Sequence, residues 1–431
     1  MLRLALLALN VCLCSAFDNG LGKKPQMGWN SWNKFGCDIN ETVILSTAQK
    51  MKELGLLEYG YEYIVMDDCY ALKQRDPDTH KIVEDPDKFP NGILDLSKKI
   101  HDLGFKFGMY SSAGKYTCAG YPGSLHYEEI DADTFANDWE IDYLKYDNCF
   151  NEGNSGTAKI SYERYNNMSQ ALLNTGRPIF YSLCQWGEDH VWDWGSTLAN
   201  SWRISGDIYD NFDRYDDRCP CETYDCPGLQ GYACSINNIL EKAVPLGQKA
   251  SEFLGWNDLD SLEVGNGGMT TSEYKAHFTL WAILKSPLVL GNDVTGMSDE
   301  DFAIVTNKAI IAINQDGSRP ANRMWKKKTE GGYLHLFTNL LNNGTTVVTL
   351  YNSGDAVKDT TVKFSDIFFG DKKSAAKSYT FSELWTNDTF TAERKFKTDI
   401  GEHSVKIWWL DCPEEYCGTS EDNSKRFDFE Y

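Results

Sequence analysis

The chain of 431 residues contains 42% hydrophobic residues and carries a formal net charge of −21 at pH 7. This length exceeds the usual size of one compact domain, so two domains, or one large barrel with an appendage, are expected. The acidic balance argues against nucleic acid and anionic lipid as partners and favours neutral or cationic ones.

The N-terminus has the layout of a secretory signal peptide. Arg3 precedes an apolar run from Leu4 to Leu13, and small residues follow as far as Ala16. Such a run is too short to span a membrane, so we expect residues 1–16 to be removed and the mature chain to be secreted to the extracellular space. A secreted chain can carry N-linked glycans, and we expect some of the four sequons to be used, which begin at Asn40, Asn167, Asn343 and Asn387.

Eight short apolar stretches between residues 25 and about 316 predict β-strands. In chain order they are QMGWNSW, YEYIVMDD, FKFGMYSS, DYLKYDNC, PIFYSLCQW, NSWRISGD, FLGWNDLD and SPLVLGND. The segments between them, such as ETVILSTAQKMKELGL and SYERYNNMSQALLNTG, are apolar at helical spacing. Strands that alternate with helices in this way favour an α/β fold, a (β/α)8 TIM barrel over residues 17–317, rather than an open sheet.

The sequence changes in character after INQDGSRP. Segments GGYLHLFTNL, TTVVTLYNSG, DTTVKFSDIFF, SYTFSELW and SVKIWWL are rich in β-branched and aromatic residues, and turn residues separate them. They predict a C-terminal antiparallel β-sandwich domain over residues 318–431. The closing EDNSKRFDFEY is expected to form a mobile or loosely docked tail.

Thirteen cysteines occur, and two of them, Cys12 and Cys14, lie in the signal segment, so the mature chain has an odd number. In an oxidising compartment most should pair and one thiol should be left over. Cys412 and Cys417 can close a small C-terminal loop, whereas Cys184 has no obvious partner.

Four further cysteines crowd the stretch CPCETYDCPGLQGYAC and are expected to staple one long loop; they are Cys219, Cys221, Cys226 and Cys234. A zinc site is the rival interpretation, weakened by the signal peptide and by the absence of histidine between these cysteines. No HExxH motif or histidine pair at ligand spacing occurs, so no catalytic metal is expected. No GxSxG elbow or phosphate-binding glycine loop occurs either, and no cofactor is expected.

Polar residues stand at the predicted carboxyl ends of the barrel strands, where barrel enzymes carry their reactive groups. In chain order they are Trp32, then Asp67 and Asp68, Tyr110, Lys145 and Asp147, Cys184 and Trp186, Arg203 and Asp207, and finally Asp258 and Asp260. Carboxylates and cations bind hydroxyl groups, and indole faces pack on C–H surfaces. The set therefore suits a sugar ligand.

Simpler interpretations exist for single members of this set. Lys145 and Asp147 lie two residues apart on one side of a predicted strand, and by themselves they favour a structural ion pair at the strand end. Asp207 follows Gly206 and could be a helix N-cap. The adjacent acids Asp67 and Asp68 could form a metal-binding or turn pair.

Seven motifs taken together closely resemble, in order, those of the melibiase-type α-galactosidase family of glycoside hydrolases, which includes secreted fungal and plant enzymes. They are LGxxPQMGWNSWNKFGC, DDCY, GMYSSAGKYTCAGYPGS, YLKYDNC, YSLCQWG, SWRISGD and GWNDLD. The resemblance runs from about residue 20 to residue 320, and the C-terminal domain resembles the family only in architecture. It implies a retaining α-galactosidase that hydrolyses terminal non-reducing α-D-galactose from melibiose, raffinose-type oligosaccharides and galactomannan side chains.

The resemblance also implies roles for individual residues. Asp147 of YLKYDNC would be the nucleophile that forms a covalent galactosyl intermediate, and Asp207 of SWRISGD would be the acid/base. The galactose would be bound by Trp32, Asp67, Asp68, Tyr110, Cys118, Lys145, Cys149, Cys184, Trp186, Arg203 and Asp260. The implied partner is a carbohydrate with a terminal α-galactose, with no nucleic acid and no membrane, while assembly into a homo-oligomer stays open.

The chemistry of these residues agrees with the implied roles. A retaining mechanism needs two carboxyl groups about 5–5.5 Å apart. Lys145 beside Asp147 should favour its ionised form, as a nucleophile requires. An anionic neighbour and partial burial should raise the pKa of Asp207, as a general acid requires.

The same resemblance implies disulfide pairs, namely Cys37–Cys69, Cys118–Cys149, Cys219–Cys234 and Cys221–Cys226. Cys184 would then stay reduced in the pocket, where it and Trp186 would close the site around C2 of the sugar. The related α-N-acetylgalactosaminidases carry small residues there, so the larger C2 substituent should be rejected. Two alternatives remain, an α-N-acetylgalactosaminidase and, as a protein without enzymatic activity, a secreted galactose-binding lectin.

Overall fold

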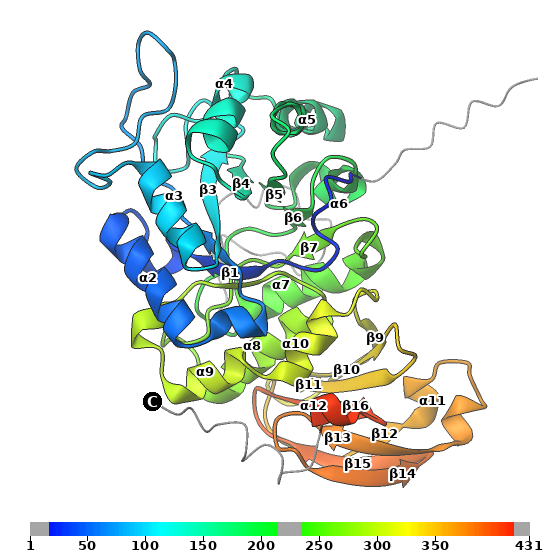
Figure 1. Ribbon diagram of the computed structural model, residues 1–431. Helices are drawn as coiled ribbons and strands as arrows, with labels where there is room; N and C mark the ends of the chain where they lie inside the picture. The colour runs from blue at the N-terminus through cyan, green and yellow to red at the C-terminus, as the bar shows by residue number, and fades with distance from the viewer. Residues whose placement is uncertain (1–16, 214–233, 418–431) are drawn as a thin grey trace, which may run out of the picture.

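The structure of the protein is a computed structural model that describes residues 17–213 and 234–417. A closed parallel sheet with helices around it forms the first part of the described chain, and an antiparallel β domain lies below it in Figure 1. The expected TIM barrel followed by a C-terminal β-sandwich is confirmed. None of the helices in the described ranges is long and apolar enough to cross a membrane.

Eight parallel strands form the barrel, and all eight predicted strand stretches contain one of them. The strands are β1 Met27–Asn30, β2 Tyr63–Val65, β3 Lys106–Ser112, β4 Tyr143–Asp147, β5 Phe180–Cys184, β6 Ser201–Arg203, β7 Trp256–Asp258 and β8 Leu288–Leu290. Their order in the sheet is β7-β6-β5-β4-β3-β2-β1-β8. A parallel bridge between Leu262, just beyond β7, and Leu290 of β8 closes the ring.

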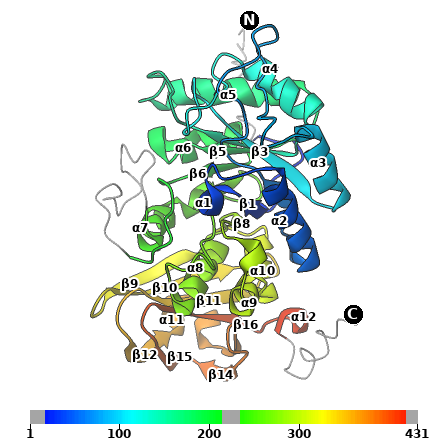
Figure 2. The ribbon, with the colours of Figure 1, turned by 90° about the vertical axis from the view of Figure 1, so that its left-hand side faces the viewer.

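Helices surround the sheet on its outer face (Figure 2). They are α1 Trp32–Phe35, α2 Glu41–Glu53, α3 Ile93–Asp102, α4 Glu128–Asp133, α5 Ala158–Asn174, α6 Val191–Trp194, α7 Ile236–Ala243, α8 Thr271–Ile283, α9 Asp299–Val305 and α10 Lys308–Gln315. Side-chain caps fix several starts: Asn40 accepts from the Val43 amide at α2, and Thr270 and Glu273 form a capping box at α8.

Aromatic rings fill the amino-terminal half of the barrel interior. Tyr63, Tyr143 and Phe180 point inward from β2, β4 and β5, and their ring centroids lie 5.2–5.9 Å apart. Because side chains alternate along a strand, the inward positions that follow Tyr143 on β4 are Lys145 and Asp147. The rings thus form an apolar layer in the barrel interior, below the polar groups of the strand ends.

The described part of the C-terminal domain contains eight antiparallel strands. They are β9 Asn322–Lys328, β10 Tyr333–Leu340, β11 Thr346–Asn352, β12 Val357–Lys363, β13 Ser378–Glu383, β14 Thr389–Glu393, β15 Lys395–Ile400 and β16 Ser404–Leu410, with the short helices α11 Phe364–Ile367 and α12 Glu414–Cys417. Strands β9, β14 and β15 were not predicted. The predicted strand DTTVKFSDIFF was partly wrong, since its FSDI portion is helix α11.

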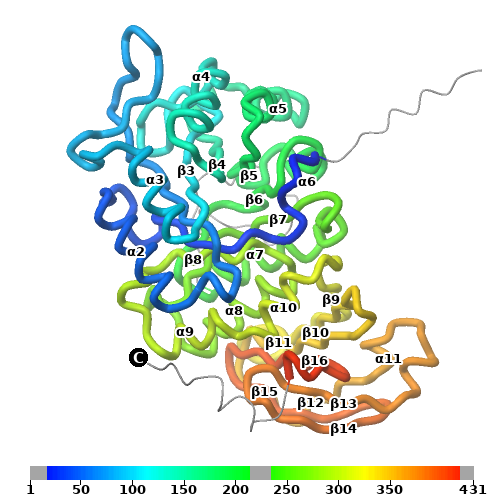
Figure 3. The backbone as a smooth tube through the Cα atoms, viewed as in Figure 1, coloured from blue at the N-terminus to red at the C-terminus, as the bar shows by residue number. Residues whose placement is uncertain are grey.

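The two domains share one apolar core, which runs from the barrel helices to β10, β11 and β16. Polar contacts add to it: the Asn339 side chain donates to the Ile283 carbonyl at 3.0 Å, and the Trp385 indole donates to the Thr279 hydroxyl at 3.1 Å. Figure 3 shows the chain passing from α10 into β9 between the two bodies. Because α10 ends at Gln315 and β9 begins at Asn322, the position of the domain boundary within that stretch stays a prediction.

Candidate active site

Strand register aligns the inward side chains at the carboxyl end of the barrel in two layers. Tyr110 on β3 lies level with Lys145 on β4, and Asp147 lies level with Cys184 on β5. On the other side of the mouth, Arg203 at the end of β6 is level with Asp258 of β7. The register therefore brings residues far apart in the sequence to one end of the barrel.

Lys145 pairs with Asp67 rather than with Asp147. Its ammonium lies 2.8 Å from Oδ2 of Asp67, which also accepts from the side-chain amide of Asn30 at 2.8 Å. The Asp67 side chain is only 2% exposed, so the pair is shielded from solvent screening. An ion pair at the strand end exists, as the isolated motif suggested, but it joins two strands.

Asp147 is held by two hydrogen bonds in a buried position. The Asn148 amide donates to Oδ1 at 2.8 Å and the Tyr110 hydroxyl donates to Oδ2 at 2.9 Å. Burial raises the pKa of Asp147 to about 7, although the positive charge of Lys145 lowers it, and the negative charge of Asp207 adds to the rise. Lys145 thus acts in the predicted direction, but burial outweighs its effect.

Arg203 organises the opposite wall of the site. Its guanidinium lies 2.9 Å from Oδ1 of Asp207 and 2.7 Å from Oδ2 of Asp260, and it donates to the Cys184 sulfur at 3.6 Å. Burial raises the pKa of Asp207 against the lowering effect of Arg203, and the charge of Asp260 adds to the rise. No helix begins at Asp207, so its interpretation as an N-cap is wrong.

The remaining residues implied to bind the sugar lie around these two groups. Asp68 follows Asp67 and accepts from the Ala119 amide at 2.9 Å, in the loop after β3. Trp32 begins α1, and its amide donates to the same Asn30 side chain that donates to Asp67. Trp186 is buried just beyond Cys184.

A disulfide lies directly against Asp147. Cys118 and Cys149 are bonded, and their sulfur atoms and a carboxylate oxygen of Asp147 all lie within 4.8 Å of one another. The sulfurs are consumed by the disulfide, so the three residues do not make a thiolate metal site. This contact supports the expectation that both cysteines border the sugar.

Comparisons with known proteins identify the family of this chain. A sequence model described as Alpha galactosidase A matches residues 24–316, and one described as Alpha galactosidase C-terminal beta sandwich domain matches residues 331–410. An α-galactosidase of Schizosaccharomyces pombe is 59% identical over 391 residues, which cover 90% of this chain and 89% of the relative.

Solved structures agree with the sequence comparisons. The crystal structure of α-galactosidase I from Mortierella vinacea has a TM-score of 0.87 and 49% identity, and the match covers 91% of this chain and 98% of that one. A structure of an α-galactosidase from Saccharomyces cerevisiae with raffinose has a TM-score of 0.87 and 42% identity, with the same coverage of 91% and 98%.

The chain belongs to the α-galactosidase family. It is an enzyme of the α-galactosidase type. Membership extends to the C-terminal domain, which has its own family match. The expectation that this domain resembles the family only in architecture is therefore wrong.

Several residues of this α-galactosidase site were not among the predicted site residues. Asn30 bridges Trp32 and Asp67, and Asn148 holds Asp147. Asp258 was named among the polar strand ends but was given no role, and burial raises its pKa to about 6, although Arg203 lowers it. Asn30 and Asn148 do stand in the quoted motifs GWNSW and YDNC, so their position beside predicted site residues was the available signal.

Cysteine pairing in the described part of this family member follows the expectation. Disulfides Cys37–Cys69, Cys118–Cys149 and Cys412–Cys417 are present, and Cys184 is a buried free thiol. Burial raises the pKa of that thiol, so it stays neutral. The predicted pairs of the 219–234 stretch, the signal peptide and the C-terminal tail involve residues outside the described ranges.

The predicted glycan acceptors of this α-galactosidase lie on the surface of both domains. Asn167 on α5, Asn343 in the β10–β11 turn and Asn387 before β14 are exposed, and Asn40 is half-buried at the start of α2. Asn40 caps α2 through its side-chain oxygen, which leaves its nitrogen for a glycan. All four positions are compatible with glycosylation, and their use stays a prediction.

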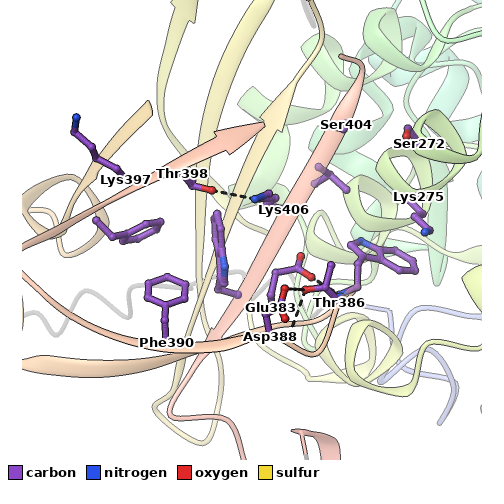
Figure 4. Close-up of a pocket in the computed structure, with 14 residues that line it drawn as sticks. Ser272, Lys275, Glu383, Thr386, Asp388, Phe390, Lys397, Thr398, Ser404 and Lys406 are labelled. Carbon is purple, nitrogen blue, oxygen red and sulfur yellow. Dashed lines mark hydrogen bonds between the residues drawn. The ribbon is translucent and has the colours of Figure 1, made fainter. Parts of the chain in front are cut away.

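A sizeable cavity among the described residues lies away from the catalytic candidates. It measures about 480 Å³ and opens between α8 and the C-terminal sheet, with Lys275, Trp385 and Trp408 in its lining. Figure 4 shows that Glu383 there is directed to the backbone of its own turn, where it accepts from the Trp385 and Thr386 amides. Its carboxylate is thus held by backbone donors, and a volume alone does not make this cavity the α-galactosidase active site.

Proposed function

We propose that this α-galactosidase releases terminal α-D-galactose with retention, through a covalent intermediate on Asp147. The observation that carries the proposal is the arrangement of two carboxyl groups with raised pKa values at one barrel mouth, Asp147 beside Tyr110 and Asp207 beside Arg203. Retaining glycosidases require one carboxyl group to attack and a second to exchange a proton.

The proposed reaction has two chemical steps. In the first, the Asp147 carboxylate attacks C1 of galactose, the bond to the glycosidic oxygen breaks, and Asp207 donates its proton to that oxygen. In the second, Asp207 takes a proton from water, the water oxygen attacks C1, and the bond to Asp147 breaks. The Tyr110 hydroxyl supports the first step because it orients the attacking carboxylate.

The remaining groups around the mouth suit the binding of galactose hydroxyls. Asp67, Asp68 and Lys145 form a buried polar cluster on one side, and Arg203 and Asp260 form another on the opposite side. Buried charged groups that hydrogen-bond a hydroxyl reject sugars that lack it in the right orientation. We propose melibiose, raffinose-type oligosaccharides and galactomannan side chains as substrates, in line with the relative whose structure contains raffinose.

The product anomer tests retention directly. Proton NMR during hydrolysis of an α-galactoside should show α-galactose as the first product, before mutarotation produces the β-anomer. A first product in the β-form would exclude double displacement.

We further propose that the enzyme acts as a secreted glycoprotein, in keeping with the N-terminal signal-like segment and the exposed sequons.

We expect the side chains of Cys184 and Trp186 to exclude an acetamido group at C2. Both are buried, and Cys184 contacts Arg203, so neither side chain can move aside freely. Forcing a larger group into such a site costs about 1–3 kcal/mol, or roughly 5- to 150-fold. Replacing Cys184 by Ser and Trp186 by Ala together should raise kcat/KM on α-N-acetylgalactosaminides and lower it on α-galactosides. A wild type that cleaves both sugars equally, or a double variant without gain, would contradict this assignment.

The pH dependence of kcat/KM should be bell-shaped and should respond to Lys145. Only the singly protonated form of the Asp147–Asp207 pair is active, so activity falls on either side of the two titration steps. Lys145 lowers the pKa of Asp147, and its removal should make Asp147 keep its proton to higher pH. Lys145→Gln should therefore shift the acidic limb upward, besides weakening binding. The exposed Lys98→Gln variant is the control and should leave the profile in place.

A further inference from the structure

The loop after β5 has a strained backbone around Trp186, which together with Cys184 is proposed to form the wall of the site at C2 of the sugar. Trp186, Asp189 and His190 have φ values of 64°, 48° and 53°, in the left-handed region that residues other than glycine rarely adopt. Gly187 between them also has positive φ, and a Cβ there would meet the Ile204 carbonyl at 2.1 Å. Such a conformation persists only where surrounding contacts over-determine it.

Two carboxylates of this loop make those contacts. Oε2 of Glu188 accepts from the Asn148 side chain at 2.8 Å. Oδ2 of Asp189 accepts from the Gly156 amide at 3.0 Å and from the Ser161 hydroxyl at 2.7 Å. All three donors lie after β4 or at the start of α5. The segment that follows Asp147 in the chain therefore fixes the loop that carries Trp186. Hydrogen bonds to a carboxylate are among the strong ones.

Asn148 is the junction between this loop and Asp147. It is 1% exposed, its amide donates to Asp147, and its side-chain oxygen accepts from Arg164 at 2.5 Å. Arg164 is itself buried and also donates to the Ala113 carbonyl at 2.8 Å, in the loop after β3. Asn148 therefore has no freedom to follow a shift of either neighbour without losing a bond.

We propose that Glu188 is a positioning residue, which through Asn148 fixes the Trp186 wall relative to the Asp147 carboxylate and so sets discrimination at C2 of the sugar. This inference rests on the proposed roles of Asp147 and Trp186. Asp189 differs from Glu188 in this respect, since Gly156 and Ser161 bind it, whereas Glu188 binds Asn148, the residue that donates to Asp147.

The test compares three substitutions of Glu188 with a matched control. Glu188→Ala should lower kcat/KM on an α-galactoside about tenfold, since small misplacements in an active site cost up to 10²-fold. It should also reduce, about tenfold, the ratio of the inhibition constants of N-acetylgalactosamine and galactose. Glu188→Gln keeps an acceptor oxygen and should restore most of both values. Glu163→Ala removes an exposed carboxylate of α5 and should change neither.

Thermal unfolding separates positioning from general destabilisation. A Glu188→Ala protein that is less stable but keeps the wild-type ratio of inhibition constants would overturn the proposal, and so would a Gln variant as impaired as the Ala variant. Glu188→Asp shortens the side chain while keeping its charge; if the Ala variant does not fold, an unchanged ratio in the Asp variant has the same meaning. If Asp147→Asn retained activity, the proposed function would fail instead, so the two failures are distinguishable.

Discussion

Asp147→Asn should lower turnover at least about 10⁴-fold while the fold and galactose binding persist, because an amide cannot attack C1. The Asn side chain has the same shape, and its oxygen can still accept from the Asn148 amide. Turnover of an aryl α-galactoside and calorimetric binding of galactose measure the two properties separately. Substantial residual hydrolysis would exclude Asp147 as the nucleophile. The exposed Asp102→Asn variant is the control and should keep full activity.

The Asp147→Asn variant should also differ from the wild type in how its stability depends on pH. Burial raises the pKa of Asp147 to about 7, so the folded state holds a proton that the unfolded state releases near its ordinary value of 3.8. Between these values, stability falls as the pH rises. The Asn variant lacks this loss, and its melting temperature relative to wild type should rise between pH 4 and pH 8. A constant difference would contradict the raised pKa.

Local sequence patterns were enough to predict the barrel and its strand ends. In the YLKYD stretch of β4 side chains alternate across the strand, so Lys145 and Asp147 fall on the same inward face as Tyr143. The strand ends could be predicted because each motif carries its own reactive residue. What those residues contact is a non-local property: the partner of Lys145 is Asp67, 78 positions away, rather than the nearby Asp147.

The unpredicted strands lack the local signals that usually indicate a strand. In β9, the NRMWKKK stretch is half charged and lies at the edge of its sheet, where lysines are tolerated and apolar alternation is weak. Strands β14 and β15 are short and meet at Arg394, whose φ is 65°, without the Gly or Asn that normally signals such a turn. β9 is a strand because it pairs with β10, and β14 because it pairs with β13, while β15 pairs with the more distant β12.

The loop after β5 shows a further limit of sequence analysis. Nothing in YSLCQWGEDH indicates three side-chain-bearing residues in the left-handed region, because the contacts that impose them come from the segment after β4. The motif identified Cys184 and Trp186 but not the acids that hold them in place. Such positioning roles can be inferred only when the hydrogen-bond donors to each carboxylate are known from a structure.

Asp207→Asn should separate the two steps of the reaction. Hydrolysis of melibiose should fall roughly 10²- to 10⁴-fold, since its leaving oxygen needs a proton that the amide cannot supply. An activated aryl α-galactoside needs little protonation, so its first step should be nearly unaffected and the galactosyl intermediate should accumulate. The amide oxygen can still accept from Arg203, which keeps the geometry of the wall. Burst kinetics on both substrates measure this difference.

Azide should then rescue the Asp207→Asn enzyme, because this small anion attacks the intermediate without a general base. The stereochemistry of the product decides between the roles of the two aspartates. Asp147 holds the sugar in the β-configuration, so attack by azide from the opposite face yields α-galactosyl azide. Wild-type enzyme, which already has its base, should gain nothing from azide. Equal losses on melibiose and the aryl substrate without rescue, or a β-galactosyl azide product, would show that Asp207 is not the acid/base.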